Sequence, residues 1–109
     1  MTYNETLARR IRTALAGKPG LSEKKMFGGV AFLVNGNMAF GVLGDDIIVR
    51  VGPDRHAEAL SHQDTRPFDM TGRPMKGWVM VSSGGLQSEA DFLKWLHWGM
   101  DFATSLPPK

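Results

Sequence analysis

Hydrophobic residues recur with helical spacing at the start of the chain. The apolar positions of this first stretch are Leu7, Ile11, Ala14 and Leu15. At 3.6 residues per turn they share one helical face, and Gly17 and Pro19 are suited to end the helix. Thr2 and Glu5 have the spacing of a capping box. The pattern therefore predicts that the chain opens with an amphipathic helix.

The next apolar positions have the short period of strands. Two apolar runs flank Asn35-Gly36, the strongest short signal for a hairpin with a type I′ turn. A second tight connection at Gly44-Asp45-Asp46 leads into a third run, Ile47 to Val51. The two adjacent carboxylates suit turn chemistry better than acid–base chemistry. We expect a three-stranded antiparallel meander.

A two-residue turn fixes the register of the predicted hairpin. The expected pairs are Val34 with Asn37, Leu33 with Met38, Phe32 with Ala39, and Ala31 with Phe40. In this register large side chains meet small ones, and both faces of the hairpin are apolar. An antiparallel sheet with one face in water should instead alternate with polar residues. Each face must therefore be covered, by helices of this chain or by a second copy of it.

The rest of the chain completes an α+β pattern. A short helix is predicted from Pro53-Asp54, with Ala57 and Leu60 pointing inward. A strand is predicted from Gly77 to Ser82. Ser88 and Asp91 mark the start of a last helix, which runs to about Thr104. Gln63 to Met75 has no clear period, although Phe68 to Met70 could form a short strand. We expect a single domain over residues 1–109, with a meander and at least one further strand flanked by helices in the order α-β-β-β-α-β-α.

The last predicted helix carries more apolar surface than one core contact needs. One stripe holds Phe92, Leu96, Gly99, Met100 and Ala103. A second stripe beside it holds Trp95, Trp98 and Phe102. Either this helix lies deep in the core, or its aromatic side meets a partner, since Trp is both largely buried in proteins and enriched at interaction hot spots. We take Trp95, Trp98, Phe102 and the strand residue Trp78 as the candidate partner or dimer surface.

Composition narrows the possible functions. The 109 residues include no Cys, which excludes disulfides and thiolate metal sites and permits a reducing compartment. The N-terminal stretch lacks the apolar run of a signal peptide, and the longest apolar run is far too short to span a bilayer. We therefore expect a cytoplasmic protein without a membrane anchor. The net charge of +2 is too small to imply a nucleic-acid partner by itself.

Catalytic and cofactor motifs are not recognisable in the sequence. Gly28-Gly29 precedes a strand, whereas a phosphate-binding loop opens onto a helix, so backbone crowding or a bulge explains the pair better. His56, His62 and His97 have no metal-ligand spacing. Ser82-Ser83 lacks the strand-turn-helix pattern of a nucleophile elbow. We expect no enzyme activity, no cofactor and no bound metal.

Basic residues gather in two places. Arg9, Arg10 and Arg12 lie on the polar side of the first helix, where a solvated face is the simpler interpretation and a phosphate-contacting face the alternative. The second group lies between residues 66 and 76 and consists of Arg66, Asp69, Arg73 and Lys76. Such a group suits a structural loop, a protein contact, or an anion or nucleic-acid site. Arg9, Arg12, Arg66, Arg73 and Lys76 are the candidate anion or nucleic-acid contacts.

Three segments together resemble the N-terminal domain of the TfoX/Sxy family. They are KKMFGGVAFLVNGNMAFGVLGDDIIVRVGP, DMTGRPMKGWVMV, and an aromatic helix that ends in SLPPK. The resemblance covers essentially the whole chain. It implies a small bacterial cytoplasmic protein with an α+β fold similar to type III secretion chaperones, in which a helix-flanked antiparallel sheet is often dimeric.

The same resemblance implies a regulatory role. The family is named for a regulator of natural competence that acts as a co-activator beside a cyclic-AMP receptor protein. That regulator carries a second, helical domain which this sequence lacks, so we do not carry co-activation over. The family supplies no catalytic residues to transfer.

The leading hypothesis is a non-enzymatic, homodimeric protein-interaction module in a regulatory setting. The rival is a nucleic-acid-binding accessory protein that uses the basic residues of the first helix and of the 66–76 loop. An enzyme is the third possibility, and it would require a pocket that joins Asp69, Arg73 and a histidine.

Overall fold

A six-stranded antiparallel sheet organises the chain. The computed structural model describes residues 3–26, 28–69 and 74–108. The elements are α1 (Glu5–Ala14), β1 (Leu21–Met26), β2 (Gly29–Val34), β3 (Asn37–Leu43), β4 (Asp46–Arg50), α2 (His56–Leu60), β5 (Thr65–Asp69), β6 (Pro74–Val81) and α3 (Glu89–Ser105), with short 3-10 turns η1 (Pro53–Arg55) and η2 (Ser83–Leu86). The strand order is β1-β2-β3-β4-β6-β5. The predicted α+β class is confirmed, with β1 and β5 added to the expected elements.

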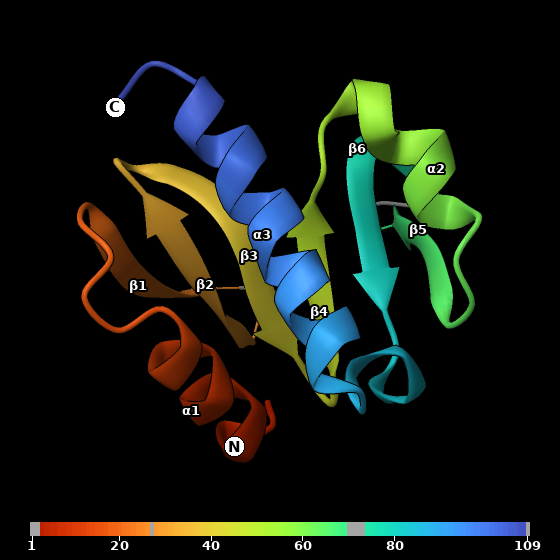
Figure 1. Ribbon diagram of the computed structural model, residues 1–109, viewed down its shortest axis with the longest axis horizontal. Coiled ribbons are helices and arrows are strands. Elements are labelled where there is room, and N and C mark those ends of the chain that lie inside the picture. Colours follow the sequence, from red (N-terminus) through yellow and green to blue (C-terminus); the bar gives the residue numbers. More distant parts are fainter. Residues whose placement is uncertain (1–2, 27, 70–73, 109) are drawn as a thin grey trace.

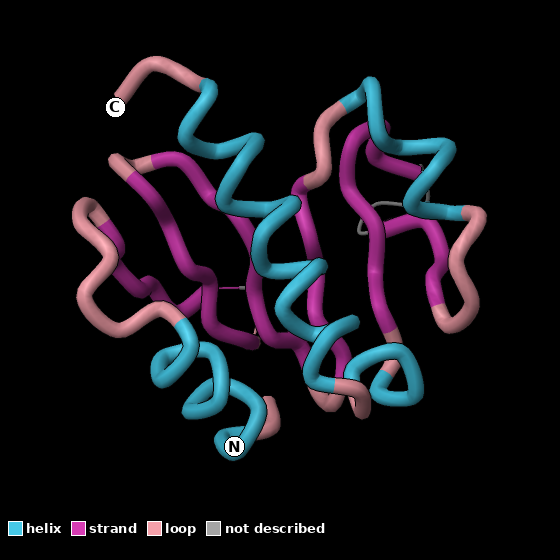
Figure 2. Tube along the Cα trace, in the orientation of Figure 1, coloured by secondary structure: helices cyan, strands magenta, loops and turns pink. Residues whose placement is uncertain are grey.

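The helices of the described residues lie on one face of this sheet. Figure 1 shows α3 crossing in front of β3 and β4, with α1 toward β1 and α2 toward β5 and β6, and the tube in Figure 2 shows the same layering. Ala59 of α2 and Phe92 of α3 belong to one buried cluster with Ile11 of α1 and Val49 of β4. The fold is therefore a two-layer arrangement, helices over a sheet. No helix in the described ranges is both long and apolar enough to cross a bilayer.

The helix ends follow local capping chemistry. The N-cap of α1 is Asn4, whose side chain accepts a hydrogen bond from the Leu7 backbone N–H. The predicted capping box of Thr2 and Glu5 was therefore wrong, because the cap is Asn4 and Glu5 is the first residue of the helix; Thr2 itself lies outside the described residues. Ser88 caps α3 as predicted, since its side chain accepts from the backbone N–H of Asp91. In α2 the buried residue is Ala59, so the prediction that Ala57 points inward was wrong.

The β2–β3 hairpin has the predicted turn but not the whole predicted register. Asn35 and Gly36 have φ values of 53° and 85°, as a type I′ turn requires. The pairs nearest the turn are as expected, but a shift in register after Leu33 then places Phe32 opposite Phe40. Their rings pack at 5.5 Å on the helix side of the sheet. The expected pairs of Phe32 with Ala39 and of Ala31 with Phe40 were wrong.

The irregularity lies where α3 presses on the sheet. A Cβ placed on Gly99 of α3 would lie 2.6 Å from the carbonyl oxygen of Ala39 and 2.8 Å from Cδ1 of Phe40. The register shift leaves Ala39 as the extra residue of β3, completely buried at this contact. Close approach of a helix to a sheet therefore accompanies the change in register. Gly29 is likewise crowded by backbone, as predicted, because a Cβ there would overlap the carbonyl oxygen of Val42.

Two strands were not anticipated in full. β1 is polar and mostly exposed, and it pairs with β2 along its whole length. The sequence left open a short strand from Phe68 to Met70; β5 contains Phe68 but begins at Thr65, and Met70 lies outside the described residues. Both are edge strands, so one side of each is paired and the other has no neighbouring strand in the described part of the chain.

Candidate functional site

The aromatic residues proposed as a partner surface separate into two groups. Trp95 is only 2% exposed and belongs to the core, so the monomer does not present it to a partner. Trp98 is half-buried and packs edge-on against Trp95 at 5.3 Å. Trp78 lies on the face of the sheet away from the helices, because successive side chains of a strand alternate between faces and its neighbour Val79 points into the core. The structure therefore does not unite the four aromatic residues in one patch.

Cations of the chain itself cover the aromatic side of α3. The guanidinium of Arg55 lies 5.3 Å from the Trp98 ring centroid, and its Nη2 pairs with Asp101 at 3.2 Å. The guanidinium of Arg50 lies 5.2 Å from the ring centroids of both Phe102 and Trp78. Cations over ring faces are favourable and keep the rings from water. The second apolar stripe of α3 is thus accounted for largely within the chain.

The proposed anion-contacting residues are dispersed and in part neutralised. Arg12 donates to Glu23 at 2.8 Å and to Glu5 at 2.9 Å, and these hydrogen bonds raise its pKa. The hydrogen bond from Arg12 is the main cause that lowers the pKa of Glu5 below its ordinary value of 4.5. Arg66, near the other edge of the sheet, pairs with Asp46 at 2.8 Å.

The remaining candidates do not assemble a basic patch among the described residues. Arg9 is exposed on α1, and Lys76 is exposed on β6. Arg73 lies outside the described residues, so the candidate pocket that would join it to Asp69 and a histidine is also outside them. Within the described ranges no group of three His, Asp or Glu side chains is placed to hold a metal ion.

The face of the sheet away from the helices is not covered by any helix of the described residues. Strand alternation places on it a set of apolar side chains that are absent from the helix-side core cluster. This open face consists of Leu33, Met38, Leu43, Ile48, Trp78 and Met80, with the small residues Ala31 and Gly41 at its centre. Leu33, Met38 and Met80 are half-buried, whereas Ile48 is only 3% exposed because its neighbours surround it.

One row of cross-strand neighbours defines this open face. From β1 to β5 the row reads Lys24, Ala31, Gly41, Ile48, Met80 and Arg66. It begins and ends on a cation and has no charged residue between them. An apolar centre with a charged rim is the usual anatomy of a protein interface. The sequence predicted that both faces of the β2–β3 hairpin are apolar, but it did not indicate which face the helices cover.

Helices over one face of an open antiparallel sheet make this an α+β domain, a class of fold that does not by itself define a function. The family model described as the TfoX N-terminal domain matches residues 13–103, so the chain belongs to this family. The resemblance read from the sequence is thereby confirmed. No curated protein and no solved structure matches the chain.

Proposed function

We propose that this chain is a non-enzymatic protein-interaction module of a regulatory system and that it works as a homodimer. The observation that carries the proposal is the open face, an apolar sheet surface that the described helices leave uncovered. Membership of the TfoX N-terminal domain family supports a regulatory setting. We also place the module in the bacterial cytoplasm. This compartment is reducing, and a chain without cysteine suits it because its stability does not depend on a disulfide.

A second copy of the chain suits this surface. Two sheets pack face to face about 10 Å apart when their inner side chains are apolar. The centre of the open face holds the small residues Ala31 and Gly41, and the row that crosses it carries no charge there that a symmetric contact would bury. Lys24 and Arg66 remain at the rim, in water. Covering half-buried side chains such as Met80 and Leu33 contributes up to about 1.5–3 kcal/mol for each that becomes fully buried.

Sedimentation equilibrium of the purified chain tests the proposal directly. We expect a dimer at micromolar concentration in the wild type and a monomer in Met80→Glu, because the dimer would bury an unpaired carboxylate. Leu93→Glu is the matched control: Leu93 is 44% exposed and lies on α3, on the helix side of the sheet. It should leave the dimer intact.

Circular dichroism distinguishes loss of assembly from loss of fold. A Met80→Glu chain with the wild-type helical signal and a monomeric mass supports the open face as the interface. A wild-type monomer at tens of micromolar, or a Met80→Glu dimer, contradicts the homodimer.

A further inference from the structure

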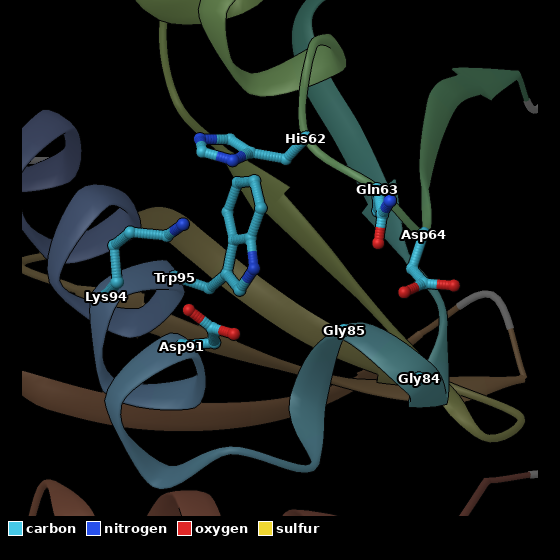
Figure 3. Close-up of a pocket in the computed structure, with 8 residues that line it drawn as sticks. All are labelled: His62, Gln63, Asp64, Gly84, Gly85, Asp91, Lys94 and Trp95. Atoms are coloured by element: carbon cyan, nitrogen blue, oxygen red, sulfur yellow. The ribbon is translucent and has the colours of Figure 1, made fainter.

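Two cavities on the helix side of the molecule differ in the chemistry of their walls. A cavity of about 310 Å³ is lined by Asp64, Asp91 and Lys94 (Figure 3), so side chains of both charges line it together and favour no single class of ligand. A smaller cavity, of about 200 Å³, is a groove between the C-terminal end of α1 and the middle of α3 (Figure 1). Neither the family assignment nor the proposed homodimer gives this groove a role.

Apolar side chains form most of the groove. Leu15 and Leu96 are buried, whereas Ala14 and Met100 are half-buried. Leu93 is 44% exposed, and among the described residues it is the only large hydrophobic side chain that is exposed. Removing such a side chain from water is favourable. The groove therefore favours an apolar ligand.

An ion pair bounds the groove at one end. Nη2 of Arg10 lies 2.9 Å from Oε1 of Glu89, and Nη1 of Arg10 also donates to the Leu86 carbonyl at 2.7 Å. Arg10 lies one helical turn before Ala14 on the same face of α1. Glu89 stands in the same relation to Leu93 on α3. The groove is therefore closed toward the N-terminal ends of both helices.

Hydrogen-bond donors, one of them a free cation, lie at the other end. Lys18 follows α1, and its backbone N–H donates to the Leu15 carbonyl at 3.1 Å, which fixes the turn that carries it. Lys18 takes part in no ion pair with any residue that the structure describes. His97 lies one turn after Leu93, and an imidazole carries an N–H donor whether neutral or protonated. No Asp or Glu of the described residues lines the groove, so charge complementarity favours an anion.

We propose that this groove binds a medium-chain aliphatic carboxylate, with its alkyl chain against Leu93 and Leu96 and its carboxylate toward Lys18. A volume of about 200 Å³ equals that of about seven water molecules and suits an unbranched chain of about six carbons. The carboxylate accepts hydrogen bonds from an ammonium group, and such charge-assisted bonds are stronger than neutral ones. The closed end at Arg10 and Glu89 favours a ligand that ends within the groove over a polypeptide segment that runs through it.

NMR of the chain labelled with ¹³C at its methionine methyl groups tests the site. Met100 lines the groove, whereas Met38 and Met80 lie on the open face and report binding elsewhere. We expect hexanoate to shift the Met100 signal saturably, with a dissociation constant of about 1 mM or tighter, and to leave the other two signals unchanged. Butanoate has a shorter chain and should bind about ten-fold more weakly. Hexylammonium, with a similar chain and the opposite charge, should not shift Met100.

Variants separate the groove from a general surface effect. Lys18→Gln should weaken hexanoate binding about ten-fold, whereas Lys76→Gln, at an exposed lysine of β6 outside the groove, should not change it. Leu93→Glu should abolish binding, because it places a carboxylate beside that of the ligand. Lys18 and Leu93 are both exposed, so the two groove variants should keep the wild-type circular dichroism spectrum.

Several results would overturn the proposal. Hexanoate would not shift Met100, hexylammonium would bind as tightly, or the Lys18→Gln and Lys76→Gln variants would bind hexanoate equally well. Shifts confined to Met38 and Met80 would also overturn it, because they would place the ligand on the open face. Tighter binding of an acetylated Leu-Leu-Glu peptide than of hexanoate at Met100 would assign the groove to a partner protein instead. None of these results depends on whether the chain dimerises, because the groove lies on the helix side.

Discussion

Nδ1 of His56 accepts a hydrogen bond from the backbone N–H of Gly77 at 2.9 Å, which joins the start of α2 to the middle of β6. Gly77 is buried and has a φ of 91°. A Cβ on Gly77 would lie 3.2 Å from the carbonyl carbon of Gly52, so the strand also approaches the loop after β4 closely. The His56 imidazole thus provides a hydrogen-bond acceptor for the Gly77 backbone N–H, which has this partner in place of a neighbouring strand.

His56→Ala should destabilise the fold by about 1–3 kcal/mol, because it leaves a buried N–H without its acceptor. Urea unfolding followed by circular dichroism measures the change. His97→Ala, at an exposed position of α3, is the control and should stay within about 0.5 kcal/mol of wild type. Equal stability of the two variants would show that the hydrogen bond from Gly77 contributes nothing.

Gly99→Ala should destabilise the fold although alanine favours a helix. The helix propensity gain is about 1 kcal/mol. The new Cβ would lie 2.6 Å from the carbonyl oxygen of Ala39, a backbone atom that cannot move without disturbing β3. Overpacking of this kind typically costs about 1–3 kcal/mol. We therefore expect a net loss, measured as a lower unfolding midpoint in urea.

The opposite exchange provides the control for Gly99→Ala. Ala90→Gly lies in the exposed first turn of α3 and should cost no more than about 1 kcal/mol, through propensity alone. A Gly99→Ala chain that is more stable than wild type would mean that α3 can shift away from Ala39.

The Glu5 carboxylate should make stability depend on acid pH. Its pKa in the folded chain is lowered, chiefly by the hydrogen bond from Arg12, so its contribution is fully present above the unfolded value near 4.5. The contribution is lost as the pH falls through the lower, folded pKa. Thermal unfolding from about pH 6 to pH 3 should therefore show a smaller acid loss for Glu5→Gln than for wild type. Glu58→Gln, exposed on α2, should follow the wild-type curve.

Nucleic-acid binding should be weak and unspecific. Arg12 and Arg66 already pair with carboxylates, and the described residues show no continuous basic patch. Fluorescence anisotropy with labelled duplex and single-stranded oligonucleotides should show no binding at physiological salt. Tight binding that falls steeply with salt, and that Arg9→Ala or Lys76→Ala reduces, would restore the nucleic-acid hypothesis.

Local chemistry made much of the fold predictable. Asn35-Gly36 defines its own turn because both residues tolerate positive φ. Ser88 caps α3 through a contact three residues away. The apolar runs of β2 and β4 are dense enough to be strands in any packing. These features depend on neighbours in sequence, which is why the hairpin turn, the start of α3 and the meander could be predicted from the residues alone.

Contacts between distant segments account for what the sequence did not reveal. β1 has polar side chains, so its membership of the sheet depends on backbone pairing with β2. The register shift at Ala39 accompanies the approach of Gly99, sixty residues later. Arg50 and Arg55 cover rings of α3 that appeared free for a partner. The sequence also predicted that both faces of the β2–β3 hairpin are apolar, without indicating which face the helices of the chain cover.

The two edge strands limit how large an assembly can become. The edge strand β1 carries the exposed residues Lys24 and Lys25. The other edge strand, β5, contains Pro67, which has no backbone N–H to donate to a further strand. Charged side chains and proline discourage the addition of further strands. Growth of the sheet from copy to copy is therefore disfavoured at both edges, whereas the proposed contact through the open face would use the same surface of each copy and close on itself. We therefore expect the proposed homodimer to form a discrete particle and not to polymerise into fibres.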